Sequence, residues 1–102
     1  KAYDFFESQG IMPLSEYNRE LGKGWCIPTE VSLKKTKTGK PYYQVTVIDS
    51  SMETQRINCW GVNPKSDFIY PHRMYVLEWP KYNETWGFST SGGLSRNWKL
   101  LG

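Results

Sequence analysis

The sequence predicts a single domain of the all-β class. The chain has 102 residues, a length that is typical of one domain. Much of it divides into short runs in which apolar and polar residues alternate, and turn-forming residues separate these runs. Alternation with a period of two is typical of half-buried strands. Hydrophobic residues make up 38% and aromatic residues 16% of the chain, which favours a small packed core over a disordered tail.

Residues 1–23 are expected to be a helical lead-in to this domain. Leu14, Tyr17 and Leu21 fall at i, i+3 and i+7, the spacing of an apolar stripe on a helix, and two glycines follow. We therefore predict a short N-terminal helix over residues 14–21. Because two helical turns are marginally stable alone, this helix must dock on the rest of the chain.

The first two strands are predicted to form a hairpin around a lysine-rich turn. Residues 25–33 alternate, and Pro28 indicates a bulge or an edge position because it cannot donate a ladder hydrogen bond. One face would carry Trp25, Ile27, Thr29, Val31 and Leu33, and the other Cys26, Pro28, Glu30 and Ser32. The turn signal at residues 38–41 contains Gly, which permits positive φ, and Pro. The second strand covers residues 42–48, and its inward side chains would be Tyr43, Val45 and Val47.

Three more strands are predicted in the second half of the chain. After a turn at residues 49–53, the run 55–60 would place Ile57 and Cys59 inside. Residues 73–79 form the fourth run, which Pro80 ends. Residues 84–89 form the fifth, in which Trp86 and Phe88 alternate with smaller residues.

The number and linkage of these strands indicate the architecture. Five strands, with hairpins among the first three and a longer connection before the fourth, fit a five-stranded Greek-key barrel of the OB-fold type with a short N-terminal helix. A β-sandwich would require about seven strands. We expect the OB domain to cover residues 24–90, followed by a polar C-terminal tail over residues 91–102.

The positive charge of the chain is concentrated in one place. The formal net charge is only +3, but residues 34–40 contain four lysines and no acidic residue. A basic loop on a nearly neutral body fits a polyanionic partner better than a membrane, because no basic amphipathic helix accompanies it. A solvated turn is the alternative interpretation.

A barrel of this type binds nucleic acid across the outer face of strands two and three, between two flanking loops. The outer-face candidates are Tyr42, Gln44, Thr46, Arg56, Asn58 and Trp60. The loop candidates are Lys34, Lys35, Lys37 and Lys40 in the first loop and Lys81 with Tyr82 in the second. Aromatic rings stack on bases, and lysines neutralise phosphates. The alternative is that Tyr42 and Trp60 pack under a loop or against a neighbouring domain.

Catalysis and metal binding have weaker signals than nucleic-acid binding. His72 is the single histidine, and the acids Asp49 and Glu53 fit turn positions, so neither a hydrolase triad nor a two-metal site is expected. Cys26 and Cys59 lack the short paired spacing of zinc ligands. We expect them to be buried free thiols, with a disulfide left open. The prediction is a non-catalytic, intracellular module without a cofactor or a membrane partner.

Six segments in the first 60 residues occur in a familiar order. They are residues 4–8 (DFFES), 12–17 (MPLSEY), 27–31 (IPTEV), 35–42 (KTKTGKPY), 45–49 (VTVID) and 58–60 (NCW). This series resembles the OB domain and its lead-in in the C-family replicative DNA polymerases of bacteria and phages, the polymerase III alpha subunit family. The GKP hairpin and the trailing Asp49 are its most specific part.

The resemblance implies a role in DNA replication. In that family the catalytic carboxylates lie in another domain, so this chain would be a non-catalytic piece of a larger polymerase that contacts the single-stranded template. Its partners would be single-stranded DNA and other domains of the polymerase or replisome. Two alternatives stay open: a protein-interaction module of a replication complex, and an anticodon-type RNA-binding OB domain.

Overall fold

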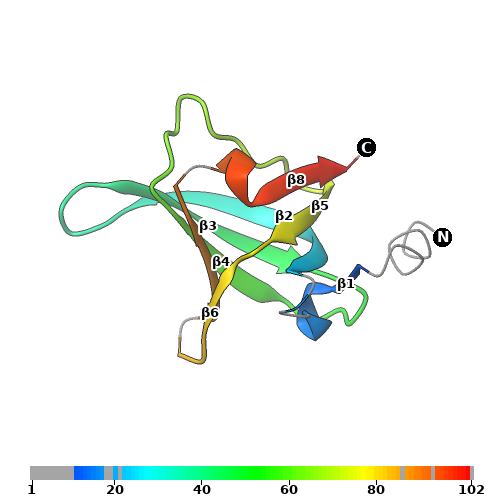
Figure 1. The fold of residues 1–102 in the computed structure, drawn as a ribbon. Coiled ribbons are helices and arrows are strands. Elements are labelled where there is room, and N and C mark those ends of the chain that lie inside the picture. Colours follow the sequence, from blue (N-terminus) through cyan, green and yellow to red (C-terminus); the bar gives the residue numbers. More distant parts are fainter. Residues whose placement is uncertain (1–10, 18–19, 21, 86, 93, 102) are drawn as a thin grey trace.

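The computed structural model describes residues 11–17, 20, 22–85, 87–92 and 94–101, and they are mostly β-structure (Figure 1). The strands are β1 (Met12–Pro13), β2 (Lys23–Lys35), β3 (Pro41–Ile48), β4 (Gln55–Trp60), β5 (Met74–Glu78), β6 (Lys81–Asn83), β7 (Gly87–Ser91) and β8 (Trp98–Leu101). Two short 3-10 helices are η1 (Leu14–Glu16) and η2 (Leu94–Arg96). Within this described part, no helix is long and apolar enough to cross a membrane.

The strands form one sheet that curls on itself. Its order is β6-β7-β4-β3-β2-β5-β8, with β1 paired to β2. The β4–β7 and β1–β2 pairs are parallel, and the other pairs are antiparallel. Strands β5 and β6 lie far apart in this order, yet only Trp79 and Pro80 separate them in the chain. The sheet must therefore bend around a common core, and Figure 1 shows this curled half-barrel.

The long strand β2 confirms the predicted bulge at Pro28. Its first residues pair with β5 and its later ones with β3, and the register shifts between Pro28 and Glu30. Cys26 is fully buried in the main core before the bulge, whereas Val31 packs against that core after it. The prediction that one face runs unbroken from residue 25 to 33 is therefore wrong, because an extra residue in one strand exchanges its two faces.

The inward side chains of strands β3 and β4 belong to the main core, as predicted. Tyr43, Val45, Val47, Ile57 and Cys59 are all buried, and they alternate with more exposed residues. This agreement follows from antiparallel pairing, in which inward positions of neighbouring strands meet.

The two cysteines are buried free thiols, and no disulfide joins them. Burial raises the pKa of Cys59 to about 11, and burial also raises the pKa of Cys26. Both thiols are therefore protonated at neutral pH and act as small apolar core groups.

The N-terminal segment does not form the predicted α-helix. Among the described residues of this segment, only Leu14–Glu16 is helical, as a single 3-10 turn, and Tyr17 leaves it with φ −52° and ψ 128°. Residues 18, 19 and 21 of the predicted helix lie outside the described residues. Leu14 is nevertheless 1% exposed, and the Tyr17 ring packs on Phe88 at 5.5 Å. Tertiary contacts bury Leu14 and partly bury Tyr17 without a helical stripe.

Asp49 connects this segment to the turn after β3. Its carboxylate accepts hydrogen bonds from the backbone N–H of Ser15 at 2.8 Å, and from the N–H and hydroxyl of Ser51 at 2.9 and 2.6 Å. Burial raises the pKa of Asp49, but these hydrogen bonds to the charged form outweigh that effect, so the pKa is lowered. The turn residue is thus also a tether for η1.

The end of the chain differs most from the prediction. The predicted strand at residues 84–89 is instead a hairpin, in which residues 84 and 85 lie in a turn between β6 and β7. Within the described residues there are eight strands, so the predicted count of five is not confirmed. The expected C-terminal tail contains η2 and β8, and β8 pairs with β5.

Candidate functional site

The outer face of β3 and β4 carries the six side chains predicted to face outward. Inward neighbours are buried, whereas these six are partly or well exposed: Tyr42, Gln44, Thr46, Arg56, Asn58 and Trp60. The face is mostly polar because a strand buried on one side presents its other set of side chains to solvent.

An aromatic pair occupies one end of this face. The rings of Tyr42 and Trp60 lie with centroids 4.5 Å apart and planes at 36°. Trp60 is still 39% exposed, so a large part of its indole remains open to a ligand. Lys34 pairs with Tyr42 across β2 and β3, which places a cation-bearing residue next to the rings.

A polar row crosses the sheet beside this pair. Gln44 is opposite Asn58, and Gln44 Nε2 donates to Asn58 Oδ1 at 3.4 Å. Asn58 is in turn opposite Ser89, and Ser89 is opposite Lys81. Amide, hydroxyl and ammonium groups therefore follow one another over four strands, on the side of the aromatic pair.

The aromatic pair and the polar row as far as Ser89 line a groove of about 590 Å³. Its lining is Tyr42, Gln44, Arg56, Asn58, Trp60, Asn83, Thr85, Gly87 and Ser89. The structure therefore brings together five predicted outer-face residues, while Thr46 lies outside the lining, opposite Arg56 and Glu30 in the sheet. The groove combines stacking surfaces, neutral donors and acceptors, and one guanidinium.

Sequence reasoning missed the groove residues contributed by the β6–β7 hairpin, which are Asn83, Thr85, Gly87 and Ser89. Treating residues 84–89 as one strand hid the turn. The available signal was Gly87, which has a φ of +77° and begins β7. Glycine adopts this left-handed conformation readily and therefore often marks a turn.

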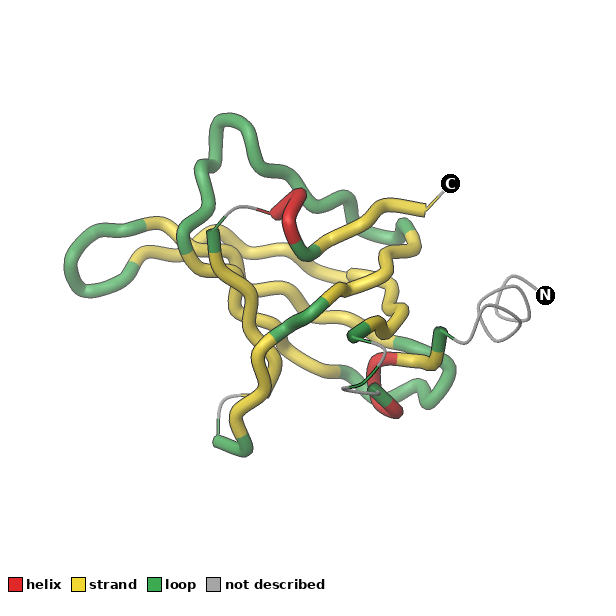
Figure 2. The backbone as a smooth tube through the Cα atoms, in the orientation of Figure 1, coloured by secondary structure: helices red, strands yellow, loops and turns green. Residues whose placement is uncertain are grey.

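The lysine cluster lies on the β2–β3 hairpin, which projects away from the rest of the sheet in Figures 1 and 2. Lys37 and Lys40 are in the turn, where Gly39 has a φ of +86°. Lys34 and Lys35 belong to strand β2 and not to the loop, which corrects the prediction. All four lysines are exposed.

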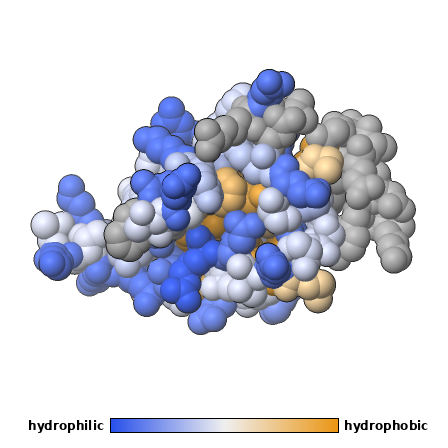
Figure 3. Space-filling model, turned by 90° about the horizontal axis from the view of Figure 1, so that it is seen from below, coloured by the Kyte–Doolittle hydropathy of each residue, from blue (hydrophilic) through white to orange (hydrophobic). Residues whose placement is uncertain are grey.

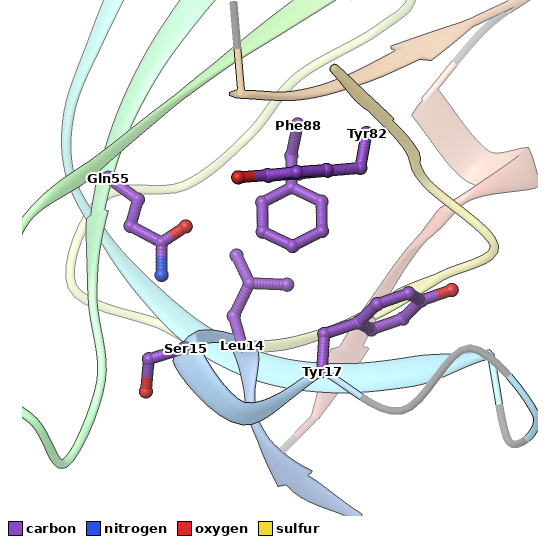
Figure 4. Close-up of a pocket in the computed structure, with 6 residues that line it drawn as sticks. All are labelled: Leu14, Ser15, Tyr17, Gln55, Tyr82 and Phe88. Atoms are coloured by element: carbon purple, nitrogen blue, oxygen red, sulfur yellow. The ribbon is translucent and has the colours of Figure 1, made fainter. Parts of the chain in front are cut away.

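The second predicted loop pair also requires correction, because Lys81 and Tyr82 lie in strand β6. Alternation in that strand puts the two side chains on opposite faces. Tyr82 instead lines a different hollow at one end of the sheet, where its ring packs on Phe88 at a centroid distance of 5.0 Å (Figure 4). Tyr82 is therefore not part of the groove, whereas Lys81 extends the polar row on the outer face.

Figure 4 shows the hollow at that end, which has a volume of about 240 Å³. Its lining is Leu14, Ser15, Tyr17, Gln55, Tyr82 and Phe88. The view from below in Figure 3 shows a largely hydrophilic surface with hydrophobic side chains in a central hollow. No charged side chain is among the six that line the end hollow, so the outer groove is the better candidate for a charged ligand.

Metal chemistry has no candidate centre in the described ranges, where no three His, Cys, Asp or Glu residues are grouped to hold an ion.

Comparison of the chain with protein-family models, with curated proteins and with solved structures found no match. The groove itself is thus the basis for a functional proposal.

Proposed function

We propose that the chain is an OB-type barrel that binds single-stranded nucleic acid, with single-stranded DNA as the preferred ligand. Sheet order supports this fold assignment. Strands β2, β3 and β4 form a meander, and β5 returns to pair with β2, which is Greek-key order. The barrel strands would be β2, β3, β4, the bent β5–β6 pair and β7. OB barrels bind oligonucleotides on their second and third strands, here β3 and β4.

The observation that carries the proposal is the groove over these two strands, with its open aromatic pair. Bases would stack on Tyr42 and Trp60, since every base has a π-face. Gln44 and Asn58 offer donors and acceptors to base edges. Arg56 and the hairpin lysines would contact phosphates, which carry the charge of the ligand.

We further propose that this module is a non-catalytic part of a replicative DNA polymerase. The resemblance of the GKP hairpin and its trailing Asp49 to the polymerase III alpha subunit family supports this role. A domain of that kind holds the template strand while another domain carries out nucleotidyl transfer.

Fluorescence anisotropy with labelled oligonucleotides tests the binding proposal. The protein is titrated into single-stranded DNA, double-stranded DNA and single-stranded RNA of matched sequence. We expect the tightest binding to single-stranded DNA. Tighter binding to RNA would instead indicate the anticodon-type alternative, and no binding to any of the three would contradict the proposal.

Aromatic substitutions locate the site. Trp60→Ala or Tyr42→Ala should weaken binding by about 1 to 3 kcal/mol, because base stacking on aromatic rings contributes that much per base. This corresponds to roughly a 5- to 150-fold rise in Kd. Phe68→Ala is a matched control, since Phe68 is also exposed but lies outside the groove. Equal affinities for all variants would place the ligand elsewhere.

A further inference from the structure

The groove continues beyond the aromatic pair into a second hollow. This hollow has a volume of about 270 Å³, and its lining includes Trp79, Lys81, Ser89, Ser91 and Arg96. Ser89 lines both hollows. Trp60 is also opposite Ser91 in the β4–β7 pair, so the second hollow begins where the aromatic end of the groove stops.

Arg96 lines the second hollow, close to Gly92. The N–H of Gly92 donates to the Trp60 carbonyl at 3.2 Å. A Cβ placed on Gly92 would lie 3.4 Å from Arg96 Nη1, so the guanidinium lies over this glycine. The side chain of Arg96 is exposed. A cationic side chain therefore lies next to the glycine that is hydrogen-bonded to the Trp60 carbonyl.

Trp79 provides an aromatic surface in the lining of this hollow. Its φ is +53°, a conformation that is strained for a bulky side chain and is often found at functional positions. Its N–H donates to the Gly22 carbonyl at 2.8 Å. A Cβ on Gly22 would lie 2.5 Å from three ring carbons of Trp79, so the indole covers this glycine.

The strained Trp79 gains little from burial, because it remains 62% exposed. Packing over Gly22 fixes part of the indole while most of it stays accessible. Lys81 follows two residues later and is exposed on β6. The hollow therefore contains two cationic side chains and one held, accessible ring, which is the combination that single-stranded nucleic acid requires.

We propose that the nucleic-acid strand bound in the groove continues across β7 into this second hollow. Arg96 and Lys81 neutralise its phosphates, and a base stacks on Trp79. The inference rests on the proposed function and adds a second contact region to it. The polar row from Gln44 on β3 to Lys81 on β6 crosses three strand spacings, about 14 Å in all. A longer oligonucleotide is therefore needed to reach both the groove and the second hollow.

The test compares labelled oligothymidylates of about 4 and about 12 nucleotides, within the range of site sizes of single OB folds. Trp79→Ala and Arg96→Ala should each raise the Kd for the longer ligand roughly 5- to 10-fold, and change the Kd for the shorter one by less than about 2-fold. Trp79→Phe should restore most of the affinity, because it keeps an aromatic ring. Lys65→Ala is the cation control, since Lys65 is exposed and lines neither hollow.

The results separate this inference from the proposed function. If Trp60→Ala weakens both ligands while Trp79→Ala and Arg96→Ala weaken neither, the second contact region is refuted and the groove stands. An equal loss for both lengths in Trp79→Ala would also refute the inference, since it would show a purely structural role. Absence of binding by the unmodified protein would refute both proposals. If Trp79→Ala does not fold, Arg96→Ala alone tests the inference, because removing an exposed side chain should leave the fold intact.

Discussion

At the residue scale, Asp49 shows how one buried carboxylate joins two distant segments. Its oxygens accept hydrogen bonds from Ser15 in η1 and from Ser51 in the following turn. Charged hydrogen bonds of this kind stabilise a fold by about 1.5 to 3 kcal/mol each, and a partner left unpaired in a buried position costs a similar amount. The charge on Asp49 is therefore important for stability.

The pKa of Asp49 in the folded state lies below its ordinary value of 3.8. The ionised carboxylate therefore contributes its full stabilisation of the fold at pH values above 3.8. The contribution is lost as the pH falls through the folded pKa. Asp49→Asn should lower the free energy of unfolding by about 1.5 to 3 kcal/mol at pH 7. The difference between the two proteins should shrink below pH 3.8. Urea denaturation across this pH range measures both effects.

Glu53→Gln is the matched control for that experiment. Glu53 lies near the same turn but is exposed, so its loss of charge should change stability by less than about 0.5 kcal/mol. A difference between Asp49→Asn and the unmodified protein that stays constant from pH 7 to below the folded pKa would show that the charge of Asp49 is unimportant.

At the element scale, different groups of the β2–β3 hairpin form its turn and carry its charge. Its four lysines are exposed, and its turn is closed by a hydrogen bond from Thr36 N–H to the Lys40 carbonyl at 2.9 Å and one from Gly39 N–H to the Thr36 carbonyl at 2.9 Å. Backbone bonds and glycine geometry thus hold the hairpin, so its turn does not depend on the lysine charges.

If all four lysines contact phosphates, log K should fall with log salt with a slope of up to about −3, since each phosphate on a single strand contributes roughly −0.7. Substituting both Lys37 and Lys40 by Gln should make this slope less negative by about 1.4 while the melting temperature changes little. Lys65→Gln serves as the control. Binding that is independent of salt would show that the hairpin is only a solvated turn.

At the scale of the whole molecule, the C-terminal strand β8 completes the core. Trp98 is 5% exposed, and its ring packs edge-on against Tyr75 at 5.6 Å. Its Nε1–H also donates to the Thr90 hydroxyl at 3.4 Å. This side chain connects β8 with β5 and β7, so residues 98–101 belong to the folded unit.

Trp98→Ala should therefore lower the free energy of unfolding by about 3 to 5 kcal/mol, as expected for a large aromatic removed from a core. Leu100→Ala is the control in the same strand, because Leu100 is 44% exposed and should cost much less. Chemical denaturation monitored by circular dichroism measures both variants. Similar stabilities for the two would mean that β8 is a dispensable tail.

The contrast between buried and exposed positions in one strand also explains which sequence predictions succeeded. In β3 and β4, strict alternation predicted the buried side chains of Val45 and Ile57 and the outward orientation of Tyr42 and Trp60, because each strand is buried on one side. Alternation failed in β2, since the bulge at Pro28 exchanges the faces. The helical spacing of Leu14 and Tyr17 also failed to predict the local structure, because the chain leaves η1 at Tyr17 and the half-buried Tyr17 ring packs on Phe88.

The sequence by itself determined the all-β class, the central strands and the outer-face residues, because these follow from the local periodicity of a pleated chain. Only the tertiary structure decided which distant residues share a groove. Pairing of β4 with β7 brings the β6–β7 hairpin beside Tyr42 and Trp60, and the bend at Trp79 returns β6 to that sheet. Such long-range pairing depends on the burial of a common core, which no local pattern of residues encodes.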